Sequence, residues 1–89
     1  MISASLIAAH TYEVVVEGAV ETRHTVRMSP DLYRRLCGAT VTHEWVLIQA
    51  FKLLRERAPD TAIVADFDLS TVDRDLPGFD AELQRRLGR

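Results

Sequence analysis

The sequence predicts an α+β fold, in which an N-terminal antiparallel β-hairpin packs on a long central helix. Shorter helices are expected before and after that helix, with an amphipathic helix near the C-terminal end. Polar and apolar residues alternate between Thr11 and Met28, which is typical of strands with one buried face, and apolar residues recur at helical spacing between Thr42 and Pro59. A chain of 89 residues can bury one modest core, so we expect a single domain over residues 1–89.

The hairpin is predicted from two strands, Thr11–Glu17 and about Val20–Met28, with Gly18 between them. Opposed residues of an antiparallel pair lie on the same face of a sheet, and a two-residue turn would set apolar residues against charged ones. We therefore expect a loop of three or five residues, which places Val16 beside Thr22, Val14 beside His24 and Tyr12 beside Val26. The outer face then carries Glu13, Val15, Glu17, Glu21, Arg23, Thr25 and Arg27.

A short helix is predicted after the hairpin. Ser29 is a favourable N-cap, Pro30 fits the first helical position, and Asp31 follows at the positive end of the helix dipole. Gly38 can adopt the left-handed conformation that ends a helix. The lone cysteine, Cys37, is expected to be a small buried side chain.

The central helix is expected to begin after Thr42, a good N-cap, and to end before Pro59, which cannot continue the hydrogen-bond ladder. Glu44 near its start and Arg55 and Arg57 near its end complement the helix dipole. Its predicted core face consists of Val46, Leu47, Ala50, Phe51, Leu53, Leu54 and Ala58.

Two apolar residues of the central helix, Trp45 and Ile48, fall outside this core face, on the polar side that includes Lys52. One interpretation is that the hairpin or the C-terminal segment folds over them. The other is that Trp45, Ile48 and Lys52 meet a second subunit or a protein partner, because Trp is over-represented at such contacts.

Beyond Pro59 the pattern weakens, and we expect a short helical turn among the apolar residues between Ala62 and Leu69. Ser70, with Asp73 three residues later, resembles a capping box and predicts another capped turn. Three apolar residues then recur at helical spacing and predict a terminal amphipathic helix ending at Gly88: Phe79, Leu83 and Leu87.

Residues 1–10 allow two structures, an additional edge strand or an interface arm. No Lys or Arg precedes the short apolar run in Met1–Ala9, so it is a poor secretory signal, and we expect a cytoplasmic protein. No apolar run is long enough to span a membrane.

The net charge of −2 is unevenly distributed. Residues 1–57 carry 7 basic and 6 acidic side chains, whereas residues 58–89 carry 4 and 7. Dedicated nucleic-acid-binding domains are usually far more basic than either part, so the charge disfavours a nucleic-acid partner without excluding it.

No metal, cofactor or catalytic site is predicted. His10, His24, His43 and Cys37 lack the close spacing of a zinc site. The acidic cluster beginning at Asp66 departs from an EF-hand loop at Thr71 and Pro77, so we expect helix capping there and leave calcium or magnesium binding open. No glycine-rich phosphate loop or catalytic signature occurs, and an enzyme is the least favoured class. The acidic cluster consists of Asp66, Asp68, Asp73 and Asp75.

The segment His24–Tyr33, followed by Val41–Trp45 leading into a long helix, resembles the strand and two helices of ribbon-helix-helix DNA-binding proteins. In that family, alternating polar residues of paired strands enter the major groove. The resemblance implies a DNA-binding regulator in which Arg23, Thr25 and Arg27 contact DNA.

The segment from Tyr12 nearly to the end of the chain is similar to a family of small uncharacterised prokaryotic proteins. It supports the domain limits and implies no activity. Its features are Tyr12–Val16, His24–Val26, Tyr33, Leu36, Glu44, Leu47, Ile48, Phe51, Leu53, Leu54, Arg57, Pro59, Ile63, Phe67–Leu69 and Pro77–Phe79.

The function favoured by the sequence is therefore that of a small, non-enzymatic interaction module. We expect a homodimer or a complex with a protein partner, formed through Trp45, Ile48 and Lys52, and no membrane association. The alternative is a ribbon-helix-helix-like DNA-binding regulator, and an enzyme or a metal-binding protein is a minor alternative.

Overall fold

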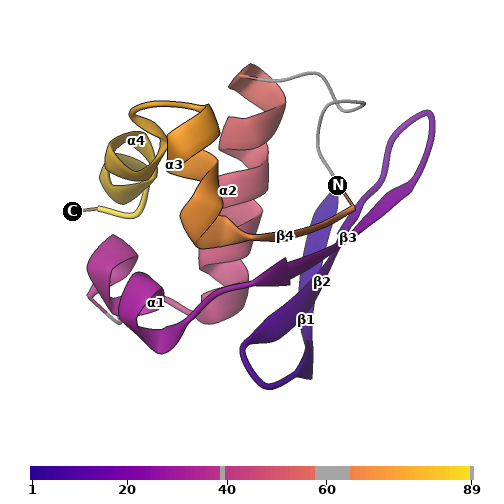
Figure 1. Cartoon of the computed structure of the whole chain (residues 1–89). Helices are drawn as coiled ribbons and strands as arrows, with labels where there is room; N and C mark the ends of the chain where they lie inside the picture. Colours follow the sequence, from indigo (N-terminus) through magenta and orange to yellow (C-terminus); the bar gives the residue numbers. More distant parts are fainter. Residues whose placement is uncertain (39, 58–64, 89) are drawn as a thin grey trace.

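The computed structural model describes residues 1–38, 40–57 and 65–88 and confirms the predicted α+β class. A four-stranded sheet has its strands in the order β1-β2-β3-β4, and the helices pack together against one of its faces (Figure 1). The strands are β1 (Ile2–Ala8), β2 (Thr11–Val16), β3 (Thr22–Arg27) and β4 (Asp66–Asp68).

The register of β2 and β3 confirms the odd-length loop. Val16 pairs with Thr22, Val14 with His24 and Tyr12 with Val26. All of these except Thr22 are buried beneath the helices, whereas Arg23 and Arg27 on the other face are exposed. The five residues between the strands thus keep the apolar face of the hairpin continuous.

The N-terminal residues form an edge strand rather than an arm. β1 pairs antiparallel with β2, and the ladder extends to Met1 and Glu17, whose backbone groups exchange hydrogen bonds of 2.8 and 3.2 Å. The register shifts between Leu6 and Ala8, and His10 adopts a positive φ of 54° in the tight connection to β2.

Helices α1 (Pro30–Cys37) and α2 (His43–Arg57) have the predicted caps. Ser29 Oγ accepts a hydrogen bond from Leu32 N at 3.2 Å, and Thr42 Oγ1 accepts one from Trp45 N at 3.1 Å. Gly38 ends α1 with a φ of 62°. Six residues of the predicted core face are buried: Val46, Leu47, Ala50, Phe51, Leu53 and Leu54. The seventh, Ala58, and the predicted stop at Pro59 lie outside the described residues.

The expected helical turn before Leu69 is wrong where the structure describes it. Phe67 lies in β4, which pairs in parallel with β3, and Ala65 O accepts a hydrogen bond from Thr25 N at 2.7 Å. This pairing joins segments about forty positions apart, so no local pattern reveals it. The rest of the expected turn, residues 62–64, lies outside the described residues.

The next capped turn exists, but Ser70 is not its cap. A 3-10 helix, η2 (Leu69–Thr71), leads into α3 (Val72–Asp75), and Asp68 caps η2 by accepting hydrogen bonds from the backbone and hydroxyl of Ser70 at 2.9 and 2.7 Å. The terminal helix α4 (Phe79–Arg86) is as predicted, with Phe79, Leu83 and Leu87 buried.

The core lies between the sheet and the helices, and Phe51 of α2 is at its centre. The Phe51 ring lies 5.2 Å from the ring of His24 on β3 and 6.1 Å from that of Phe67 on β4. Cys37 is buried, as predicted. Within the described residues, no helix is both long and apolar enough to cross a membrane.

Candidate interaction surface

The predicted interface residues of α2 remain accessible. Trp45 is 45% exposed, Lys52 is exposed and Ile48 is half-buried. No element in the described part of the chain covers Trp45 completely. A large indole at this exposure on an otherwise polar helix side is a candidate contact residue.

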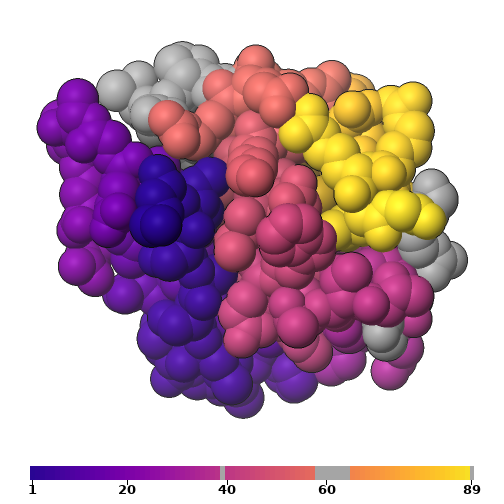
Figure 2. All heavy atoms as spheres, turned by 180° about the vertical axis from the view of Figure 1, so that it is seen from behind, coloured from indigo at the N-terminus to yellow at the C-terminus, as the bar shows by residue number. Residues whose placement is uncertain are grey.

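Strand β1 supplies a second exposed apolar group that the sequence analysis did not single out. Leu6 is 60% exposed and Ile7 is 55% exposed. β1 packs closely against α2, and Figure 2 shows the two side by side on one face, β1 in indigo and α2 in pink. We call Leu6, Trp45, Ile48 and Lys52 the β1–α2 face.

A stack of rings fixes the start of α2 against α1 and against the start of β2. The His43 ring lies 3.7 Å from the Tyr33 ring and 6.0 Å from the Tyr12 ring, nearly parallel to both. Tyr12 is the register partner of Leu6. The first turn of α2, including Trp45, therefore lies at the Leu6 end of β1, and His43 is held between two tyrosines rather than on the open surface.

The outer edge of β1 presents unpaired backbone groups. In the part of the chain that the structure describes, β2 is the only strand that pairs with β1. Met1 and Glu17 form a hydrogen-bonded pair, and such pairs alternate with non-hydrogen-bonded ones in an antiparallel ladder. The backbone N–H and C=O groups of Ile2, Ala4 and Leu6 therefore point away from β2, toward solvent.

The edge of β1 lacks the protection that natural edge strands usually have. Its sequence, ISASLIA, contains no charged residue and no proline, both of which discourage pairing with another chain. This absence of charge was visible in the sequence and is the signal that could have pointed to an accessible edge.

Two charged residues of α2 flank Ile48. Glu44 lies one helical turn before Ile48 and Lys52 one turn after it, so the three form a stripe along the helix. Burial raises the pKa of Tyr12, and the nearby carboxylate of Glu44 raises it further. Neither Glu44 nor Lys52 makes an ion pair with any other described residue.

The residues of the DNA-binding alternative, Arg23, Thr25 and Arg27, lie together on the outer face of β3. Both arginines form ion pairs there. Arg23 forms ion pairs with Glu13 and Glu21, each at 3.2 Å. Arg27 forms one with Asp66 at 2.6 Å. β3 is hydrogen-bonded to β2 along its whole length and to β4 over Thr25–Arg27, so this half of β3 has no open edge for pairing with a strand of a second subunit.

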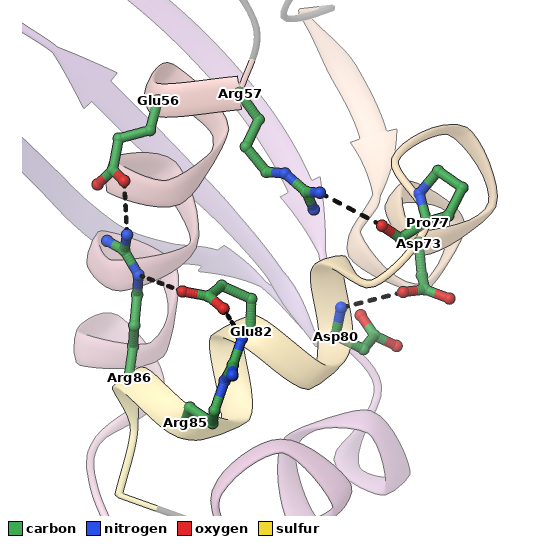
Figure 3. Close-up of polar contacts among 8 residues, drawn as sticks. All are labelled: Glu56, Arg57, Asp73, Pro77, Asp80, Glu82, Arg85 and Arg86. Carbon is green, nitrogen blue, oxygen red and sulfur yellow. Dashed lines mark hydrogen bonds and ion pairs between the residues drawn. The ribbon is translucent and has the colours of Figure 1, made fainter.

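A surface cleft of about 420 Å³ lies between α2 and α4 (Figure 3). Its charges largely satisfy one another: Arg86 pairs with Glu56 at 2.6 Å and with Glu82 at 3.8 Å, and Arg85 pairs with Glu82. Arg57 donates a hydrogen bond to the carbonyl of Pro77 at 3.4 Å. This arrangement ties the terminal helix to α2 and presents no convergent set of groups for a ligand.

The acidic cluster has structural roles. Asp66 pairs with Arg27, Asp68 caps η2, and Asp73 Oδ1 accepts a hydrogen bond from Asp80 N at 3.1 Å (Figure 3). Among residues 1–38, 40–57 and 65–88, no three His, Cys, Asp or Glu side chains converge as a metal site would require.

Comparison of the chain with models of known protein families, with curated proteins and with solved structures found no match.

Proposed function

We propose that this chain is a small, non-enzymatic interaction module that self-associates or binds a protein partner through the β1–α2 face. The observation that carries the proposal is the exposed indole of Trp45 in the first turn of α2, which lies at the Leu6 end of the exposed strand β1. Aromatic anchors next to apolar surface are typical of contact sites, and contact with another protein would remove this surface from water.

A photo-crosslinking amino acid at position 45 tests this proposal. We expect irradiation of cells producing that variant to give a covalent adduct. A second copy of the chain would give an adduct of twice the monomer mass, and a different partner would give another mass. The matched control carries the same group at Val20, which is 77% exposed in the hairpin loop, away from the β1–α2 face. Equal labelling at both positions, or none at position 45, would contradict the proposal.

The DNA-binding alternative predicts affinity that falls steeply with salt, because phosphate contacts release counterions. Since Arg23 and Arg27 are paired with carboxylates and β4 already covers the second edge of β3 over Thr25–Arg27, we expect no such binding. Fluorescence anisotropy with labelled duplex DNA at low salt checks this. Salt-sensitive binding that Arg23→Ala and Arg27→Ala abolish would restore the alternative.

A further inference from the structure

We infer that the partner at the β1–α2 face is a second copy of this chain, joined by antiparallel pairing of the two β1 strands around Ala4. This inference rests on the proposed function, because it names the occupant of the same face. Two self-complementary patterns support it, one on β1 and one on α2.

The first pattern is the distribution of unpaired backbone groups along β1. The groups that face solvent belong to Ile2, Ala4 and Leu6. A two-fold axis at Ala4 pairs Ala4 with its own copy and Ile2 with the partner's Leu6, so all of these groups exchange hydrogen bonds. Shifting the register by two residues in either direction leaves some of them without a partner, so the central register satisfies the most groups.

The side chains of β1 are compatible with this pairing. β1 carries no charge, so two copies can approach without bringing like charges together. The exposed Leu6 would lie beside the partner's Ile2, on the helix-covered face of the joined sheet. Pairing therefore buries apolar surface that a single copy leaves in water.

The second pattern is the stripe on α2. α2 runs opposite in direction to β1 (Figure 1) and begins at the level of Leu6, where His43 stacks on Tyr12. A helix advances about 1.5 Å per residue and a strand about 3.3 Å, so about four or five helical residues span two strand residues. This count places Ile48 near the level of Ala4, and thus near the same axis.

A two-fold axis near Ile48 makes the stripe complementary to itself. Glu44 and Lys52 lie four residues on either side of Ile48, so each faces the oppositely charged residue of the partner. The two ion pairs would flank a central contact between the Ile48 side chains. Both patterns are complementary to themselves under the same two-fold axis, and this favours a second copy over a partner of different sequence.

Removal of a single N–H group tests the strand pairing. Ala4→Pro deletes a donor that faces solvent rather than β2, and proline is tolerated in edge strands at such positions. We expect the wild-type chain to be a dimer by light scattering across a concentration series, and Ala4→Pro to weaken association at least about tenfold. Ser3→Ala, which leaves the β1 backbone unchanged, is the control and should remain dimeric. Circular dichroism and thermal unfolding show whether each variant is folded.

Charge reversal tests the helix contact independently. Glu44→Lys and Lys52→Glu each set like charges against one another twice per dimer, so each should weaken association about tenfold. The double variant reverses both members of each pair and should restore wild-type association. Rescue by the double variant requires that Glu44 and Lys52 face one another across the dimer. A general change in surface charge would not restore association.

The outcomes separate this inference from the proposed function. A monomer at every concentration overturns the inference, as does a dimer that folded Ala4→Pro leaves intact or that the double variant fails to restore. An adduct from position 45 to a different protein would then preserve the proposed function. The absence of any adduct from position 45 would reject the proposed function itself.

Discussion

At the scale of single residues, Asp80 carries an uncompensated oxygen. Its Oδ1 atom is buried without a hydrogen-bond partner among the described residues, while its other oxygen pairs with Arg35 at 3.1 Å. Burial raises the pKa of Asp80, Asp73 raises it further, and Arg35 opposes both effects. The folded protein therefore binds this proton more tightly than the unfolded chain does.

Asp80→Asn should consequently raise the free energy of unfolding at pH 7, because the amide carries no charge to desolvate. As the pH falls through the raised pKa of Asp80 toward the ordinary aspartate value, the wild-type carboxyl becomes neutral and the difference between the two proteins should shrink. Urea unfolding of both proteins from pH 7 to pH 3 measures this difference in the free energy of unfolding. A lower stability of the variant at pH 7 would show that the Arg35 pair outweighs the burial cost.

Glu56 on α2 provides a control, because its pKa is shifted in the opposite direction to that of Asp80. The hydrogen bond from Arg86 lowers the pKa of Glu56, so its contribution to stability is present above the ordinary glutamate pKa and lost as the pH falls through the lowered value. Glu56→Gln should therefore lower the free energy of unfolding at pH 7, with the deficit disappearing in acid.

At the scale of elements, the end of α1 depends on one glycine. Gly38 has a φ of 62°, and a left-handed conformation costs other residues about 1–2 kcal/mol. Gly38→Ala should therefore reduce the free energy of unfolding by about 1 kcal/mol. Gly18→Ala is the matched control: Gly18 is absent from the positive-φ positions, a Cβ there meets no atom within 4 Å, and we expect little change in chemical denaturation. Equal effects of the two substitutions would refute this account of the helix end.

The elements also show which structures were predictable from the sequence. The hairpin, α1, α2 and α4 each contain their own periodicity, and α1 and α2 also have side-chain caps, so local patterns sufficed. β4 has only three residues, two of them aspartates, and exists because β3 offers an edge to pair with. Asp68, rather than Ser70, caps η2 because the chain leaves β4 at that residue, which again required the long-range contact.

The candidate surface was predictable only in part. The helical wheel identified Trp45, Ile48 and Lys52 because their positions depend on α2 alone. Leu6 and Ile7 were missed because their exposure depends on which edge of the sheet β1 occupies and on the irregularity between Leu6 and Ala8. The position of His43 between two tyrosines likewise required three separate elements to come together.

At the scale of the whole molecule, the sheet order determines which surface is available to a partner. Residues Thr25–Arg27 of β3 lie between β2 and β4, whereas β1 is an edge strand that packs beside α2. A small domain buries a limited fraction of its surface, and association through β1 and α2 would add to its core. The architecture thus leaves an edge strand accessible at the β1–α2 face, where we propose that a partner binds.

The pairing of β3 with β4 has a consequence for biosynthesis. Thr25 pairs with Asp66, so β3 leaves the ribosome well before the segment that will cover its second edge. During that interval β3 is itself a bare edge, at which nascent chains could aggregate. Arg23 and Arg27 place positive charges along it, and such charges act as gatekeepers against intermolecular pairing.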